Sequence, residues 1–164
     1  MAVATAVFDE TQRATLEALC ETFVPSVEMD TGDPLEREFM ARSALDMQIP
    51  AQIEGMLAQA MTPEEIAAVA GLLDALAGED LASLPVEART QVVHAFRESD
   101  PEAKLGLDSL RGLTLLLFYA LPDDEGRNPN WEAIGFPGPV SQAPDAGPRR
   151  RRSRSRTSRG SRQT

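Results

Sequence analysis

The sequence predicts an all-α protein, a compact bundle of about six helices, and three features support this prediction. Hydrophobic residues make up 42% of the 164-residue chain, enough for the core of one domain. Aromatic residues make up only 5%, and Ala and Leu far outnumber β-branched residues, which favours helix over sheet. Apolar residues also recur at helical spacing in six consecutive segments, so each segment is predicted to be one helix.

The first two helices are predicted from the residues at their starts. Asp9, with Gln12 three residues later, has the pattern of a capping box and begins a helix that runs to Pro25. Pro34 suits the first position of a second helix, PLEREFMARSALDMQI, over residues 34–49. One side of that second helix is expected to hold Leu35, Phe39, Met40 and Ser43.

The next two helices have the clearest boundary in the chain between them. Pro50 lies in the first turn of a third helix. The fourth begins at Thr62, with Glu65 as its capping-box partner, and ends near Gly78. The third helix is predicted to bury a stripe formed by Ile53, Met56, Leu57 and Ala60.

The last two helices begin at Pro85 and at Asp100, and the sixth reaches about Leu121. Residues 113–121 of that sixth helix, LTLLLFYAL, are apolar on nearly every side. A helix that is apolar all round is normally surrounded by others, so we expect this stretch at the centre of the bundle.

An irregular segment follows the sixth helix. We call residues 126–139, GRNPNWEAIGFPGP, the C-terminal strap; its prolines and glycines exclude a long helix. It contains Trp131, the only Trp of the chain. Two positions are open for Trp131, together with Ile134 and Phe136: against the bundle's own core, or against a partner protein.

Charge is divided sharply along the chain. All 26 acidic residues precede Arg149, and eight of the 16 basic residues lie at 149–162, so the body has a net charge of −18 and the tail +8. The tail has no large apolar side chain and is predicted to be disordered. Its arginines define an alternative function, binding of nucleic acid or of an acidic partner, although the acidic body would repel nucleic acid and the tail has no aromatic residue for stacking.

No segment of the sequence predicts an active site. His94 and Cys20 are the only residues of their types, and Cys20 lies on the apolar stripe of the first helix, as a small hydrophobic residue would. Dinucleotide, P-loop, zinc-protease and nucleophile-elbow motifs are absent. We therefore expect a protein that is not catalytic alone and holds no cofactor or metal. Without a secretory signal or an apolar run near 20 residues, a cytoplasmic protein with no membrane span is expected.

Three segments together carry a resemblance to a known family: TLEALCETFVPS at 15–26, ARSALDMQIP at 41–50, and LTLLLFYALPDDEGRNPNWEAIGFPGP at 113–139. They resemble the small helical domain that forms the third subunit of gluconate 2-dehydrogenases. A similar domain lies at the N-terminus of FAD-dependent glucose-methanol-choline (GMC) type oxidoreductases, including long-chain alcohol oxidase-like enzymes. The resemblance covers about residues 8–140 and implies an accessory domain at 9–140 after an extension at 1–8.

The resemblance also implies a partner, a flavoprotein catalytic domain or subunit that holds the FAD. On this domain, the residues implied to dock on that partner or to form the strap are Tyr119, Asn128, Pro129, Trp131, Ile134 and Phe136. In the fused relatives a Pro-rich linker leads into the flavin domain. Residues 141–164 here run from a Pro-rich linker into the Arg/Ser tail, so we expect truncation before the flavin domain. A shifted reading frame is one explanation of the tail, and a genuine tail is the other. Translating the other two frames of the downstream DNA tests the first explanation, and the absence of a strand followed by G-x-G-x-x-G would exclude it.

Overall fold

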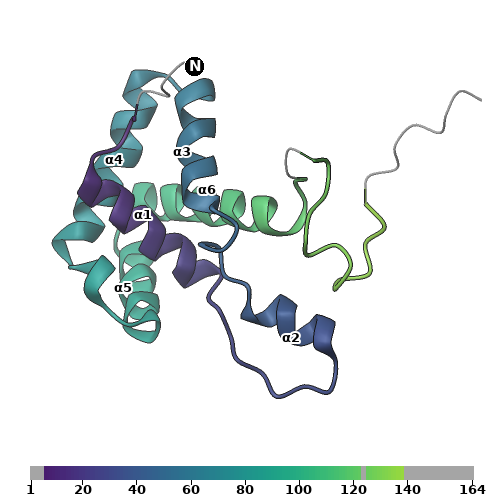
Figure 1. The fold of residues 1–164 in the computed structure, drawn as a ribbon. Coiled ribbons are helices and arrows are strands. Elements are labelled where there is room, and N and C mark those ends of the chain that lie inside the picture. The colour runs from purple at the N-terminus through teal and green to yellow at the C-terminus, as the bar shows by residue number, and fades with distance from the viewer. Residues whose placement is uncertain (1–5, 123–124, 139–164) are drawn as a thin grey trace, which may run out of the picture.

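The computed structural model describes residues 6–122 and 125–138. These residues contain six α-helices, one short 3-10 helix and no strand (Figure 1), which confirms the all-α prediction. The predicted extension at its first five residues, the end of the strap, and the linker and basic tail at 141–164 lie outside the described residues. The elements are α1 (Glu10–Phe23), α2 (Pro34–Ala41), α3 (Ile49–Ala60), α4 (Pro63–Gly78), the 3-10 helix η1 (Leu81–Ser83), α5 (Val86–Ser99) and α6 (Pro101–Tyr119).

The starts of α1, α4 and α6 are formed as the sequence predicts. The Asp9 carboxylate accepts the N–H of Gln12 at 2.8 Å, while the Gln12 side chain accepts the N–H of Asp9 at 3.1 Å. Thr62 and Glu65 form the same reciprocal pair at α4. The Asp100 side chain accepts two N–H groups in the first turn of α6. Each cap satisfies N–H groups that have no partner within their helix.

The core lies where α1 and α6 meet the other helices of the bundle. α1 contacts α3, α4, η1, α5 and α6, and α6 also contacts α3, α4 and α5 (Figure 1). The central position predicted for α6 is therefore shared with α1. The side of α1 that faces these neighbours is buried and consists of Thr15, Leu16, Ala18, Leu19 and Cys20.

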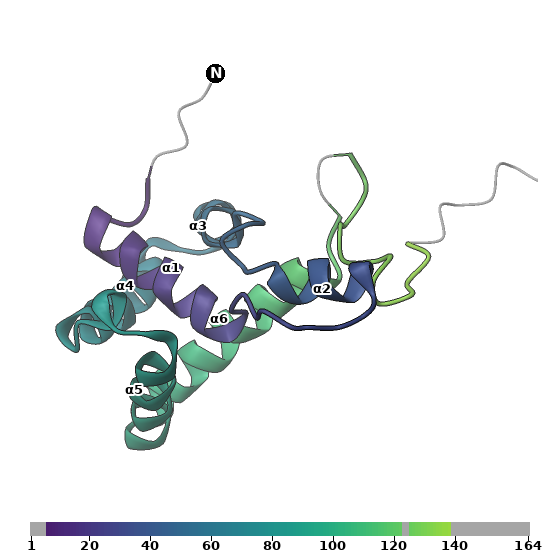
Figure 2. The same cartoon turned by 60° about the horizontal axis from the view of Figure 1, so that its bottom comes forward.

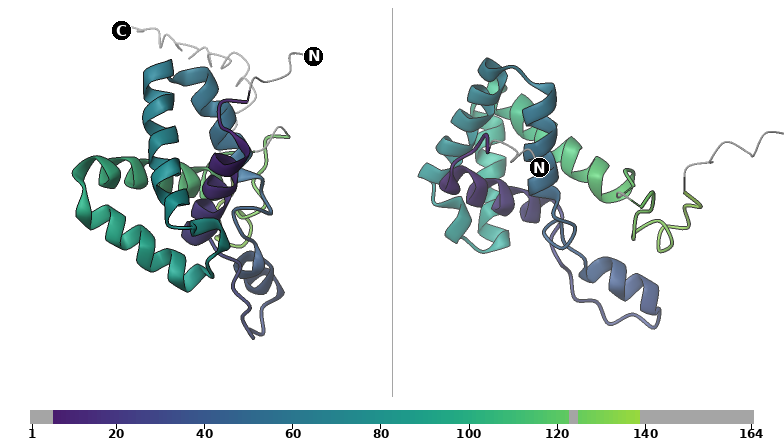
Figure 3. Two further views of the ribbon diagram at one scale, coloured as in Figure 1. Left: turned by 90° about the vertical axis from the view of Figure 1, so that its left-hand side faces the viewer. Right: turned by 45° about the horizontal axis from the view of Figure 1, so that its top comes forward.

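α2 differs from the prediction in both length and burial. It ends at Ala41, whereas the sequence predicted a helix to residue 49, and none of its residues is buried. The helix stops because the backbone N–H and the hydroxyl of Ser43 both donate to the Asp46 carboxylate, at 2.7 and 2.8 Å, and form a turn. α2 consequently lies beside the bundle (Figure 3), and Leu35, which was expected on its apolar side, is exposed.

The buried stripes of α3 and α6 are narrower than predicted. Met56 and Ala60 of α3 are exposed, although Ile53 and Leu57 on the same helix are buried. In residues 113–121, the side chains of Leu116, Tyr119 and Leu121 are exposed, and those of Thr114, Leu117 and Phe118 are buried. The reason is that this end of α6 extends past α1 and α3, so that only part of its circumference is covered (Figure 1).

Candidate functional site

The strap turns back on the C-terminal end of α6, where α2 also lies (Figure 2). Trp131 is only 7% exposed, and its indole Nε1 donates to the backbone oxygen of Tyr119 at 3.1 Å. The Phe136 ring meets the indole edge-on, with centroids 5.3 Å apart. Trp131 therefore lies between the end of α6 and the strap's own Phe136, and it is not among the residues of the bundle's core.

Asn128 holds the end of α6 through its side-chain amide. Its Nδ2 lies 2.8, 3.1 and 3.4 Å from the backbone oxygens of Leu121, Phe118 and Leu117. Its Oδ1 accepts the backbone N–H of Asn130 at 2.9 Å, which fixes the turn of the strap. The last carbonyls of a helix have no intrahelical donor, so Asn128 caps α6 from a later segment of the chain.

Asn130 completes the cap and joins it to the segment that follows α2. This fully buried side chain donates from Nδ2 to the Phe118 oxygen at 2.7 Å and lies 3.3 Å from the Met47 sulfur. Its Oδ1 accepts from Nη1 of Arg42 at 2.5 Å. Arg42 also pairs with Glu38 of α2 at 2.7 Å, so one guanidinium links α2 to the strap.

The solvent-facing side of the strap, which we call its outer face, carries exposed apolar side chains together with the charged Arg127 and Glu132. Ile134 and Phe136 of the strap are 45% and 44% exposed, and Pro129 is exposed as well. Tyr119, the last residue of α6, is 40% exposed. Of the six residues predicted for docking or the strap, Asn128 and Trp131 therefore face inward, and the other four are accessible. The strap is thus held to α6 by polar and aromatic side chains, and it presents Ile134 and Phe136 to solvent.

Two residues of this cap were missed by sequence reasoning, Asn130 and Arg42. A signal for Asn130 was present, because the helix predicted to end near Leu121 is followed by no glycine that could form a usual C-cap until Gly126. Unpaired carbonyls then require side-chain donors, which the two asparagines of the Asn-Pro-Asn sequence supply. Arg42 lies 88 residues from Asn130, and no local pattern indicates that contact.

The surroundings of His94 and Cys20, the only His and Cys of the chain, do not indicate a catalytic role. His94 is exposed, with Nε2 3.9 Å from a Glu98 carboxylate oxygen. Cys20 is fully buried, its sulfur 3.5 Å from the Thr114 hydroxyl, and desolvation raises the pKa of the thiol from 9.0 to about 11. A neutral, inaccessible thiol is no nucleophile. Among residues 6–122 and 125–138, no three His, Cys, Asp or Glu side chains come together as metal ligands would.

Fold and site define the class of protein: a small all-helical domain whose last helix is capped by an irregular strap. In the part of the chain that the structure describes, no helix combines the length and apolarity needed to cross a membrane. The chain belongs to the family described as gluconate 2-dehydrogenase subunit 3, whose sequence model matches residues 10–138. Among curated proteins and among solved structures, no match to this chain is found. The family is one of accessory dehydrogenase subunits, which work with a partner catalytic subunit.

Proposed function

We propose that this chain is a non-catalytic accessory subunit or domain of an FAD-dependent, GMC-type alcohol or sugar-acid oxidoreductase. The observation that carries the proposal is the family match over residues 10–138, which spans every helix and the strap. The close resemblance of residues 113–139 to the fused GMC-type relatives supports a flavoprotein as the partner. In this proposal the FAD and the reacting groups belong to the partner, and this chain contributes binding surface.

The outer face of the strap is the surface proposed to dock. Aromatic residues anchor protein interfaces more often than other types, and Tyr119 and Phe136 are both about two-fifths exposed. The strap that carries Phe136 and Ile134 is held to α6 by Asn128, Asn130 and Trp131. A surface fixed in this way loses little conformational entropy when a partner binds.

Purification of the full-length tagged chain tests the proposal, first alone and then from cells that contain its partner. Alone, the chain should be colourless and without oxidase turnover. With the partner, a large protein and the absorbance of a flavin should co-purify. Flavin bound to the isolated chain would contradict the accessory role, and salt-dependent retention of RNA without flavoprotein would favour the alternative function of the basic tail.

A matched pair of variants locates the contact. Ile134→Glu places a charge on the outer face of the strap, and Met56→Glu places the same charge on α3 at a similarly exposed position, 37% against 45%. We expect the first to lower flavoprotein recovery at least about tenfold, because an unpaired interfacial charge costs more than 1.4 kcal/mol. The second should leave recovery unchanged. Equal recovery with both variants, at unchanged melting temperature, would show that the strap is not the docking surface.

A further inference from the structure

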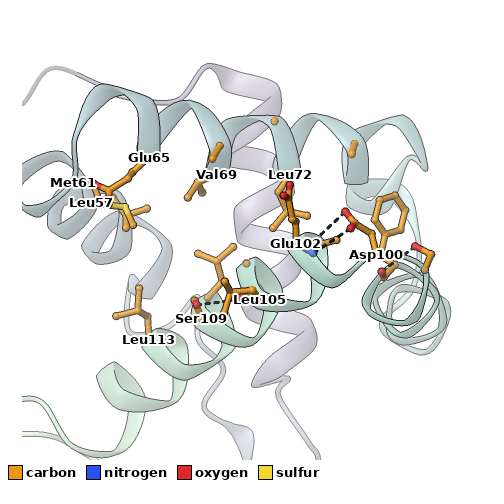
Figure 4. Close-up of a pocket in the computed structure, with 18 residues that line it drawn as sticks. Leu57, Met61, Glu65, Val69, Leu72, Asp100, Glu102, Leu105, Ser109 and Leu113 are labelled. Atoms are coloured by element: carbon orange, nitrogen blue, oxygen red, sulfur yellow. Dashed lines mark hydrogen bonds between the residues drawn. The ribbon is translucent and has the colours of Figure 1, made fainter.

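An open apolar groove runs between α4 and the N-terminal half of α6, at the end of α6 opposite the strap (Figure 4). We call it the α4–α6 groove; its volume is about 720 Å³. Val69 and Leu72 extend from α4 toward α6, and Leu105 and Ser109 lie on the facing side of α6. The groove is built from the packed part of the bundle and does not include the strap.

A glycine lines each wall of the groove, and the two glycines have different surroundings. Gly71 lines it from α4, and a Cβ added there would meet no atom within 4 Å. Gly106 lines it from α6 at its narrowest point, where a Cβ would lie 2.8 Å from the Leu72 side chain. The groove therefore has room for further side chains beside Gly71 and is closed at Gly106.

The exposed apolar and acidic side chains of the groove indicate what kind of partner it would bind. Leu105 is 71% exposed at its edge, more than any other large hydrophobic side chain in the described residues. The charged side chains that line the groove are all acidic, namely Glu65, Asp100 and Glu102. An apolar floor with an acidic rim favours a partner that is both apolar and cationic.

The length of the groove fits a short helix. Its α4 wall extends from Glu65 to Ala75, which at 1.5 Å per residue is about 15 Å. About three turns of helix have that length and can place apolar side chains at i, i+4 and i+7 in one groove. The glycines and alanines of the walls allow such a helix to approach closely.

We propose that the α4–α6 groove binds an amphipathic α-helix of a partner protein, with Lys or Arg residues flanking its apolar face. The apolar side chains of that helix cover Leu105 and fill the space beside Gly71, and its cations face Glu65 and Glu102. This site is separate from the docking surface proposed for the strap, so it gives the domain a second contact at the other end of α6.

A pair of designed peptides tests whether the groove prefers a cationic helix to an anionic one. One is a dye-labelled helical peptide with a three-turn leucine stripe flanked by Lys, and the other has Glu at every Lys position. By fluorescence anisotropy with the full chain, the Lys peptide should bind at least about tenfold more tightly at low salt, and the difference should shrink as salt screens the charges. Equal affinity of the two peptides, or no binding of either, would overturn the proposal.

A pair of glycine variants tests the location. Gly71→Leu fills the groove, whereas Gly112→Leu adds the same side chain to an exposed position of α6 outside it, where a Cβ also meets no atom within 4 Å. The first should weaken Lys-peptide binding at least about tenfold and the second should leave it unchanged. Circular dichroism melts are the control that tests whether both variants are folded. Unchanged binding by a folded Gly71→Leu variant would overturn the proposal.

Two other occupants of the groove are conceivable, a second copy of the chain and the chain's own tail, and each would give a different experimental result. A dimer detected by sedimentation and abolished by Gly71→Leu would identify a second copy of the chain as the occupant. Peptide binding that occurs only after deletion of residues 149–164 would identify the chain's own tail. Either result would overturn the proposal. Because these assays contain no flavoprotein, their failure leaves the proposed function intact, and failure of flavoprotein co-purification leaves the peptide results intact.

Discussion

The two ends of α6 both carry large apolar side chains, but one of these side chains is buried at the C-terminal end and one is exposed at the N-terminal end. At the C-terminal end, Phe118 is 2% exposed, with its ring centroid 6.0 Å from that of Phe39 in α2, and side chains of the strap bind the last carbonyls of the helix. At the N-terminal end, Leu105 is 71% exposed at the edge of the α4–α6 groove, and Asp100 caps only its own helix. Both ends also contain the opposite case, since Leu107 is 1% exposed and Leu116 is 43% exposed. Burial of each apolar side chain of α6 thus depends on which segments lie against it, and the apolar pattern of the helix does not determine this.

The largest difference between the two ends is expected from truncating one apolar side chain at each. Phe118→Ala should lower the free energy of unfolding by about 3–5 kcal/mol, because it removes a fully buried ring and leaves a cavity. Leu105→Ala should change it by less than about 0.5 kcal/mol. Urea unfolding at equilibrium measures both. Similar losses for the two variants would mean that the N-terminal end is covered in solution.

A smaller difference in stability is expected between variants that remove the cap at each end of α6. Asn130→Ala should cost about 2–3 kcal/mol, because a buried carbonyl and the Arg42 guanidinium both lose a partner. Asp100→Ala should cost about 1 kcal/mol, the usual value for an N-cap. The same urea titrations compare them. A greater loss from Asp100→Ala would show that the strap contributes little to holding α6.

Glycine substitutions in the strap and in the middle of α6 should change the stability in opposite directions. Gly138 has φ +88°, and a Cβ there would lie 3.2 Å from the Trp131 ring, so Gly138→Ala should destabilise the protein by about 1–2 kcal/mol. Gly112→Ala, in an open helical position, should stabilise it by about 0.5–1 kcal/mol. Melting temperatures record both changes. Since Trp131 is the only Trp, its fluorescence shows whether the strap detaches in the first variant; an unshifted emission with unchanged stability would contradict the close packing at Gly138.

A pH-dependent effect is expected from Cys20, which contacts Thr114 between the two ends of α6. Its pKa in the folded protein is about 11, above the 9.0 of an exposed thiol, because burial disfavours the thiolate. The neutral thiol therefore stabilises the fold fully below pH 9, and this contribution is lost as the pH rises toward 11. At pH 10 the loss should be about 1 kcal/mol. Urea midpoints at pH 8 and 10 should differ less in Cys20→Ala than in the natural chain, and equal differences would show that the thiol is not buried.

Predictions based on local sequence patterns were the most successful. Asp9 with Gln12 and Thr62 with Glu65 start helices through contacts three residues apart, so the sequence alone contains the whole interaction. The end of α2 at Ala41 was not predicted, because the Ser43–Asp46 turn competes there with a good helical pattern. Two long-range backbone bonds hold that competing conformation, from Val27 N–H to the Met40 oxygen and from Ala44 N–H to the Val24 oxygen.

The candidate site was predicted only in part for the same reason. Trp131 and Asn128 were selected because an isolated Trp in an irregular segment is unusual, and because the segment resembles a family. The sequence contains no sign of the Arg42 contact, or of which strap residues face inward, since both depend on how a segment from the far end of the chain returns. Composition likewise predicted an apolar core but not the groove, which results from the divergence of two helices that are each regular.

The cap on α6 has a consequence for local unfolding. The strap and the final turn of the helix share their hydrogen bonds, so detaching Asn128 and Asn130 leaves the carbonyls of residues 117, 118 and 121 without these side-chain donors. The two segments should therefore open as one cooperative unit, with amide protons of the last helical turn and of the strap exchanging with solvent at a common rate. A protein bound on Ile134 and Phe136 would slow exchange within α6 itself, in amides that it never touches.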